Sequence, residues 1–158
     1  AACGLVAAGI ERLTIANRTL ERASALAAEM RRPGCDVVAA SMDERGLTAV
    51  CAAADLIVNA TSVGMRYGPA EGRSPLPAGA VPEGALVYDM VYTPAETPLL
   101  LDAARAGARS VGGLSMLVFQ GAASFRMWTG VEAPVDVMFR AAEEAMAGLG
   151  IGPGQTRE

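Results

Sequence analysis

Residues 12–40 read RLTIANRTLERASALAAEMRRPGCDVVAA, and this stretch decides the fold. Arg12–Asn17 is a short apolar run with β-branched residues, which predicts a strand. The Ala-rich stretch Leu20–Arg31 predicts a helix, which Pro33-Gly34 ends before a second predicted strand at Cys35–Ala40. Strand, helix and strand at this spacing form a βαβ unit, in which the two strands run parallel.

The alternation extends toward both ends of the chain. Residues 1–8 have the composition of the second half of a helix, and Gly9 is placed to end it. Because no N-cap residue precedes this half-helix, we expect these residues to come from inside a longer chain. Further strands are predicted at residues 55–59, 85–90 and 109–111, and two closing helices at about residues 114–128 and 134–148, before a polar tail.

Two more helices are predicted by capping signals. Ser41 and Glu44 have the spacing of a capping box, which predicts a helix from there to about Ala53. Thr97 can cap a later helix that has Pro98 at its first position. Each of these helices follows a predicted strand or loop, so the alternation is kept.

Strands and helices in alternation predict an α/β fold with a doubly wound parallel sheet and helices on both faces. The strands are apolar throughout, as expected when both faces of a sheet are covered. Residues 66–84, with four prolines and four glycines, predict a long loop between two of the strands. Ligands of such sheets bind beyond the carboxyl ends of the strands, so the residues that follow each strand are the candidates for a site.

The composition excludes several kinds of chemistry. Of 158 residues, 52% are hydrophobic, and 17 acidic residues accompany 13 basic ones, all of which are arginine. Without His the sequence has no imidazole base, no Ser-His or Cys-His pair and no His-ligated metal. Without Lys it has no Schiff base and no lysine to transfer a proton. An enzyme built on these residues would work through carboxylates, arginine, hydroxyl groups and a cofactor, or would carry its proton-transfer group elsewhere.

Charge and cysteine content indicate the compartment and the class of partner. A net charge of −4 disfavours nucleic acid and anionic membranes as partners. No apolar stretch reaches the ~18 residues of a transmembrane helix, and no signal peptide is visible. Cys3, Cys35 and Cys51 are odd in number and lack C-x-x-C spacing, so we interpret them as buried thiols of a cytoplasmic protein without a metal site.

The first candidate site follows the strand Arg12–Asn17. Asn17-Arg18-Thr19 closes this strand, and Arg22 lies one helical turn after Arg18, so the two guanidinium groups can converge. In dinucleotide-binding folds an acidic residue here binds the ribose 2′-hydroxyl, whereas Arg accommodates a 2′-phosphate. The pattern therefore favours NADP over NAD. The alternative is a solvated basic turn with Thr19 as an ordinary helix N-cap.

Two further candidate segments follow the third and fourth predicted strands. Residues 59–65, NATSVGM, are small and hydroxyl-bearing, which suits close approach by a ribose or phosphate, although Asx and Ser/Thr turns use the same residues. The fourth strand ends on Asp89-Met90-Val91-Tyr92. We interpret Asp89 as a structural carboxylate that bonds the following loop, with a general base as the alternative. Tyr92 has a polar tip that could reach a substrate, or it is half-buried packing.

The last candidate segment is the turn Gly112-Gly113 and the apolar helix that follows it. Glycine permits a positive φ and the close approach of a flat ring. Gln120 is the only amide on the first turns of this helix, and it is either a satisfied core amide or a ligand contact.

Five segments in this order resemble shikimate dehydrogenase. They are Asn17-Arg18-Thr19 with Arg22, NATSVGM at 59–65, YDMVY at 88–92, ETPLL at 96–100, and GLSML at 113–117 continued to Gln120. The resemblance spans about residues 1–147 and covers the cofactor half of that family. It implies a Rossmann-like, doubly wound parallel sheet that lacks its first strand here. It also implies an NADP-binding domain at residues 1–130 and, at 131–158, a helix and tail that pack back toward a substrate domain.

The resemblance also implies roles for particular residues. The implied cofactor-binding residues are Asn17, Arg18, Thr19 and Arg22 around the adenosine 2′-phosphate, Thr61 along the dinucleotide, and Met90, Gly113 and Met116 at the nicotinamide. The implied substrate-binding residues are Tyr92 and Gln120. The family's catalytic Lys and Asp belong to the substrate domain, so none of these 158 residues receives a catalytic role. Ser115 stands where family variants have Gly, which is the one departure within these segments.

The implied function is NADP-dependent interconversion of shikimate and 3-dehydroshikimate by hydride transfer, in the shikimate pathway of aromatic amino-acid biosynthesis. The implied protein is cytoplasmic and a monomer or homodimer, and residues 1–158 alone are expected to be inactive. Two alternatives stay open: a quinate/shikimate dehydrogenase that uses NAD, and a non-catalytic nucleotide-binding module.

Overall fold

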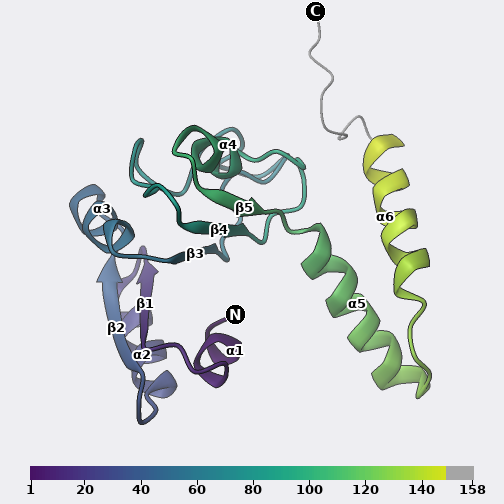
Figure 1. The fold of residues 1–158 in the computed structure, drawn as a ribbon, viewed down its shortest axis with the longest axis horizontal. Coiled ribbons are helices and arrows are strands. Elements are labelled where there is room, and N and C mark those ends of the chain that lie inside the picture. Colours follow the sequence, from purple (N-terminus) through teal and green to yellow (C-terminus); the bar gives the residue numbers. More distant parts are fainter. Residues whose placement is uncertain (149–158) are drawn as a thin grey trace, which may run out of the picture.

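The computed structural model describes residues 1–148, in which helices and strands alternate as the sequence predicts (Figure 1). The elements are α1 (Ala2–Ala7), β1 (Arg12–Asn17), α2 (Leu20–Met30), β2 (Asp36–Ser41), α3 (Glu44–Ala52), β3 (Leu56–Asn59), β4 (Leu86–Asp89), α4 (Pro98–Arg105), β5 (Arg109–Val111), α5 (Leu114–Thr129) and α6 (Val135–Gly148). The predicted polar tail lies outside the described residues.

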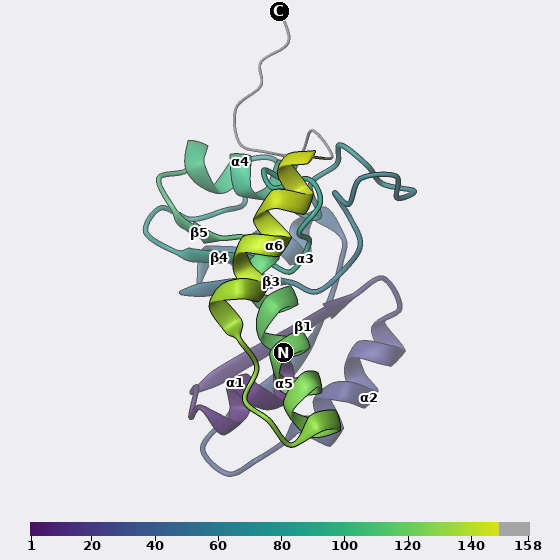
Figure 2. The same ribbon diagram turned by 90° about the vertical axis from the view of Figure 1, so that its right-hand side faces the viewer.

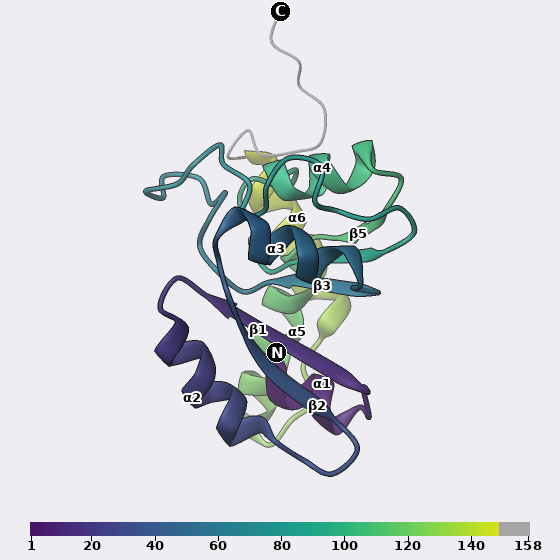
Figure 3. The ribbon, with the colours of Figure 1, turned by 90° about the vertical axis from the view of Figure 1, so that its left-hand side faces the viewer.

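All strand pairs are parallel, and within residues 1–148 the strands form two sheets. β1 pairs with β2, from Arg12 opposite Asp36 to Asn17 opposite Ser41. The second sheet has the order β3-β4-β5, and in Figures 1 and 3 its strands run in a different direction from β1 and β2. The predicted α/β class with parallel strands is confirmed. The division lies between β1 and β3. In a doubly wound order these two strands lie on either side of the first strand of the fold, which the resemblance implies is lacking here.

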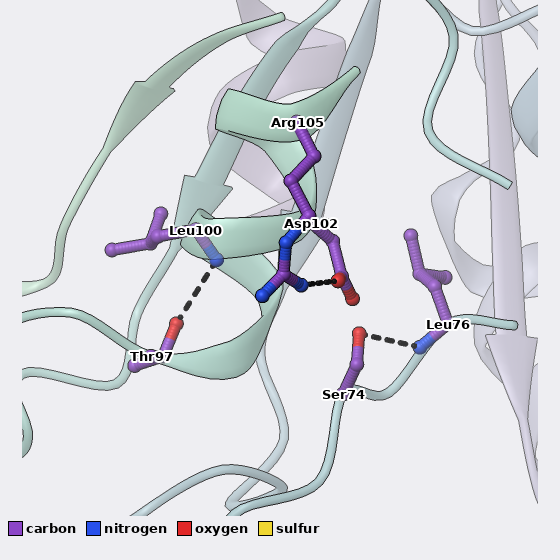
Figure 4. A network of polar contacts seen from close by, with 6 residues as sticks. All are labelled: Ser74, Leu76, Thr97, Leu100, Asp102 and Arg105. Atoms are coloured by element: carbon purple, nitrogen blue, oxygen red, sulfur yellow. Dashed lines mark hydrogen bonds and ion pairs between the residues drawn. The ribbon is translucent and has the colours of Figure 1, made fainter. Parts of the chain in front are cut away.

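Several helix ends agree with their sequence signals. Gly9 follows the C-cap of α1 with a φ of 84°, a left-handed conformation that glycine adopts without steric cost. Thr97 caps α4, because its Oγ1 accepts a hydrogen bond from the backbone N–H of Leu100 at 3.3 Å (Figure 4). Within the same helix Arg105 pairs with Asp102 at 3.0 Å. These two contacts stabilise α4 locally, one at its start and one along its last turns.

The capping box predicted at Ser41 is wrong. Ser41 is the last residue of β2, where its backbone is paired with Asn17, so it does not begin a helix. Instead Asp43 caps α3, with extended φ and ψ of −69° and 157° and an Oδ1 that accepts from the backbone N–H of Gly46 at 2.8 Å. Ser41 supports this cap from outside, since its Oγ accepts from the backbone N–H of Asp43 at 3.2 Å.

The best-packed part of the described chain lies where α4 covers the second sheet. Val81, Val87, Leu99 and Ala103 form a buried cluster there, and Val87 and Ala103 are completely inaccessible to solvent. Val81 comes from the predicted long loop, residues 66–84, which contains no helix or strand. The cluster takes in Val87 of β4, and Ile57 of β3 packs against it, so it lies beneath the edge of the sheet at which the sequence predicts a site.

The helical hairpin of α5 and α6 stands beside the sheets and packs chiefly on itself (Figure 2). The rings of Phe119 and Phe139 meet edge to face with centroids 5.5 Å apart. Large apolar side chains of this hairpin remain exposed, among them Met127, Trp128 and Val131. No helix within residues 1–148 is long and apolar enough to cross a membrane.

The three cysteines differ in exposure. Cys51 is buried, as predicted, but Cys3 is exposed and Cys35 is partly exposed, so the prediction of buried thiols is wrong for these two. Cys3 lies on the short helix α1, which buries none of its residues.

Candidate functional site

A pocket of about 460 Å³ opens beyond the carboxyl ends of β3 and β4. Ligands of parallel α/β sheets bind at this edge. Three predicted site residues, Thr61, Met90 and Tyr92, line the pocket together. The remaining lining residues are Ser62, Met65, Arg66, Val91 and Thr93.

The wall that follows β3 is an Asx turn joined to a Ser/Thr turn. The side-chain Oδ1 of Asn59 accepts from the backbone N–H of Thr61 at 3.0 Å and from its hydroxyl at 2.7 Å. The hydroxyl oxygen of Thr61 accepts in turn from the backbone N–H of Val63 at 3.1 Å. The hydroxyl hydrogen of Thr61 is therefore already donated inside the chain, and only its oxygen has capacity left for a ligand donor.

The wall that follows β4 is held by Asp89. This residue is completely buried, and its Oδ1 accepts from the backbone N–H of Val91 at 3.0 Å. The interpretation of Asp89 as a structural carboxylate is confirmed by this bond to the following loop. Neighbouring Met90 is half-buried, and Tyr92 has 40% of its surface exposed at the pocket.

Gly113 is where the turn before α5 meets the pocket wall. A Cβ placed at Gly113 would overlap the carbonyl oxygen of Met90 and lie 2.8 Å from the carbonyl carbon of Val91. The φ of Gly113 is −76°, so this position does not use the positive φ that glycine permits. Glycine is required instead because two backbone segments touch, and this contact sets Gly113 against the Met90–Val91 peptide.

The basic turn lies on the other sheet, at the carboxyl end of β1. Asn17 Oδ1 accepts from the backbone N–H of Thr19 at 2.9 Å, which shapes the turn into α2. Thr19 occupies the N-cap position, but its side chain makes no capping bond. The guanidinium groups of Arg18 and Arg22 are exposed and make no hydrogen bond or ion pair with residues 1–148. Both are thus available to an anionic ligand.

Two predicted residues stand apart from the pocket. Met116, in the first turn of α5, is half-buried and is not among the lining residues. Gln120 lies one turn further along α5 with an exposed side chain. Gln120 is likewise not among the residues that line the pocket.

The sequence also leaves some pocket residues unpredicted. Arg66 and Thr93 enter the lining because the loop after β3 folds back, with the backbone N–H of Arg66 donating to the carbonyl oxygen of Thr93 at 2.8 Å. Asn59 and Asp89 lie directly opposite each other in the β3–β4 pairing. The only sequence signal for that meeting is that Asn59 is the last and Asp89 the second-last residue of a predicted apolar strand.

The fold and this edge define a Rossmann-like α/β protein with a candidate ligand site at the carboxyl ends of parallel strands. Comparisons with known proteins specify the family. The sequence model described as shikimate / quinate 5-dehydrogenase matches residues 1–66, and the one described as shikimate 5′-dehydrogenase C-terminal domain matches residues 113–143. The chain belongs to the shikimate/quinate dehydrogenase family.

Individual relatives match nearly the whole chain. It is 44% identical to the shikimate dehydrogenase (NADP(+)) of Moorella thermoacetica over 99% of its own length and 52% of that protein. The crystal structure of shikimate 5-dehydrogenase from Thermus thermophilus in complex with NADP(H) and shikimate has a TM-score of 0.73 at 38% identity, covering 89% of this chain and 48% of that one. Quinate dehydrogenase from Corynebacterium glutamicum in complex with NAD has a TM-score of 0.77 at 34% identity, covering 88% and 48%. The chain thus spans about half the length of these relatives.

Proposed function

We propose that the protein is an NADP-dependent oxidoreductase that interconverts shikimate and 3-dehydroshikimate, and that these 158 residues supply its cofactor-binding half. The observation that carries the proposal is the pair of exposed guanidinium groups, Arg18 and Arg22, at the carboxyl end of β1. Planar guanidinium groups suit a phosphate, and this edge is where a dinucleotide carries its adenosine. The names of relatives that include NADP(+) and NADP(H) support the same cofactor.

The residues present fit this cofactor in two places. Arg18 and Arg22, with Asn17 and Thr19, would hold the 2′-phosphate. The pocket at β3 and β4 would take the nicotinamide end, with Thr61 along the dinucleotide and Met90, Gly113 and Met116 beside the ring. Bound NADP would supply the acceptor for a hydride from the carbinol carbon of shikimate.

The same half would orient the substrate without moving its proton. Tyr92 and Gln120 would contact the ring substituents of shikimate. The pocket offers no carboxylate, since its titratable lining residues are Arg66 and Tyr92, and Asp89 below it is buried and hydrogen-bonded. We therefore assign the proton of the oxidised hydroxyl to groups outside these 158 residues, which contain neither Lys nor His.

Nucleotide binding by Arg18→Ala tests the proposal. Hydrogen bonds to charged groups are worth about 1.5–3 kcal/mol, so we expect NADPH affinity to fall by roughly ten- to a hundredfold. NADH, which lacks the 2′-phosphate, is expected to bind the variant and the wild type equally. Titration followed by nucleotide fluorescence gives both dissociation constants.

Arg12→Ala is the matched control, because Arg12 lies at the opposite end of β1 and is paired with Asp36 at 3.0 Å. It is expected to leave both affinities unchanged. Equal loss of NADPH and NADH binding in Arg18→Ala would contradict the phosphate role.

A quinate dehydrogenase that uses NAD is the second candidate, because the Corynebacterium enzyme of that description, in complex with NAD, is as similar in fold as any relative quoted above. The ratio of kcat/KM for shikimate with NADP to that for quinate with NAD, measured on the complete enzyme, separates the two. A ratio well below one would favour this candidate.

A further inference from the structure

Asn59 and Asp89 form a buried polar pair beneath the pocket. They are opposite residues at the carboxyl ends of β3 and β4, with exposed fractions of 4% and 0%. Asn59 Nδ2 donates to Asp89 Oδ1 at 2.9 Å. This side-chain bond extends the β3–β4 pairing to the edge from which both pocket walls leave the sheet.

The carboxylate of Asp89 gathers three donors from three different segments. Oδ1 accepts from the Asn59 amide and from the backbone N–H of Val91. Oδ2 accepts from the hydroxyl of Thr97 at 2.6 Å. Thr97 is itself completely buried and caps α4 through the N–H of Leu100 (Figure 4). A carboxylate, which accepts and does not donate, matches all three partners.

Through Asn59 the same carboxylate reaches the opposite wall. With its amide nitrogen committed to Asp89, Asn59 turns its oxygen toward the N–H and hydroxyl of Thr61. Both pocket walls, Thr61 on one side and the Met90–Val91 peptide on the other, are thereby tied to Asp89. Gly113 contacts the Met90–Val91 peptide as well.

A buried carboxylate is a poor means of gaining stability at this position. Burying a charge costs free energy that hydrogen bonds only partly offset, and apolar residues in such places are often as stable. Within residues 1–148 no Arg forms an ion pair with Asp89. The value of this network therefore lies in the geometry that it imposes, because fully satisfied buried networks rigidify the segments that they join.

We propose that Asp89 is a positioning residue that fixes Thr61 and the Met90–Val91 peptide in the arrangement that binds the nicotinamide end of NADP. This inference rests on the proposed function for the identity of the ligand. The basic turn at Asn17–Arg22 belongs to the other sheet and shares no hydrogen bond with the network. A substitution at Asp89 is therefore expected to weaken binding of the nicotinamide end of the cofactor and to leave binding of the adenosine end unchanged.

The test compares NADPH with adenosine 2′,5′-bisphosphate, which contains only the phosphate-bearing adenosine end, on the complete protein. In Asp89→Asn one carboxylate oxygen is replaced by an NH2 group. Because both oxygens of Asp89 accept hydrogen bonds, this NH2 group must face a donor. We expect NADPH to bind about tenfold more weakly, equivalent to about 1.4 kcal/mol, while the bisphosphate keeps its affinity within about twofold. Calorimetric titration measures both ligands.

A second pair of variants tests the positioning role of Asp89 even if Asp89→Asn does not fold. Thr97→Val removes the donor to Asp89 Oδ2, whereas Thr97→Ser keeps it, so NADPH affinity is expected to fall in the first and to be retained in the second. Equal affinities in the two, or parallel loss of both ligands in any variant, would overturn the positioning role. A wild type that binds no NADPH would overturn the proposed function, whereas a binding wild type with unchanged variants overturns this inference alone.

Discussion

Gly113 is the residue at which the described backbone leaves least room for a side chain. The methyl group of Gly113→Ala would press on the backbone of Met90 and Val91, whose carbonyl carbons would lie 2.7 and 2.8 Å away. Overpacking of this kind costs about 1–3 kcal/mol. We expect a lower Tm and weaker NADPH binding, both measured on the same preparation by thermal unfolding and nucleotide titration.

Gly4→Ala is the control for this substitution. A Cβ at Gly4 meets nothing within 4 Å, and Gly4 lies inside helix α1. Alanine favours a helix over glycine by up to about 1 kcal/mol, so this variant is expected to match or exceed the wild-type Tm. A Gly113→Ala protein as stable as Gly4→Ala would show that the Met90–Val91 peptide yields freely.

Cys51 is predicted to be the least reactive of the three thiols. Burial raises the pKa of the Cys51 thiol, which disfavours the thiolate that attacks alkylating reagents. Cys3 is exposed and should be alkylated first at neutral pH, followed by Cys35. Peptide mapping after brief treatment with iodoacetamide measures the order, and denaturant should abolish it. Labelling of Cys51 as fast as Cys3 in the native protein would be inconsistent with its buried position.

At the scale of elements, the cap of α3 makes that helix sensitive to acid. Hydrogen bonds from the backbone of Gly46 and from Ser41 lower the pKa of Asp43 below its ordinary value of 3.8. Because the folded-state pKa lies below the unfolded one, ionised Asp43 stabilises the fold above about pH 3.8, and this contribution is lost as the pH falls through the folded-state value.

Two substitutions at Asp43 separate the charge from the cap. Asp43→Ala removes both and is expected to lower Tm at neutral pH, with the difference from wild type narrowing in acid. Asp43→Asn keeps an oxygen that can accept from Gly46 and should lose only the part that depends on pH. Thermal unfolding followed by circular dichroism across this pH range gives the three curves. A gap between wild type and Asp43→Asn that stays constant with pH would contradict the sign derived above.

The elements themselves are well predicted from sequence where the evidence is local. β1 has the predicted bounds, because apolar β-branched residues are directly followed by the turn Asn17-Arg18-Thr19. The start of α3 is missed, because Ser41 satisfies the local capping pattern while a non-local pairing with Asn17 keeps it in β2. The same limit applies to the pocket. The predicted residues Thr61, Met90 and Tyr92 follow strands closely, whereas Arg66 enters through a loop that folds back onto Thr93.

At the scale of the whole molecule, the candidate site is spread over both sheets. The basic turn belongs to β1 and α2, and the pocket belongs to β3 and β4. If 158 residues bind the cofactor without carrying the proton-transfer group, they should take up NADPH but not oxidise shikimate. Mixing the purified chain with shikimate and NADP and following NADPH absorbance tests this, and measurable turnover would disprove it.

The exposed apolar side chains at the turn between α5 and α6 agree with the prediction that α6 packs back toward a substrate domain, and we propose that this turn takes part in that contact. Exposed apolar patches of this kind commonly mark contact surfaces, and here Met127 is 76% exposed, Trp128 84% and Val131 60%.

Trp128 is the only tryptophan in the sequence, so its fluorescence reports on this face alone. In the 158-residue chain we expect Trp128 to be freely quenched by acrylamide. In a protein extended to the length of its relatives, the difference in fluorescence between wild type and Trp128→Phe gives the signal of Trp128. That signal should be shielded from acrylamide, because a packed domain excludes the quencher. Equal quenching of that signal in both proteins would mean that the substrate domain, where present, does not cover this face of the hairpin.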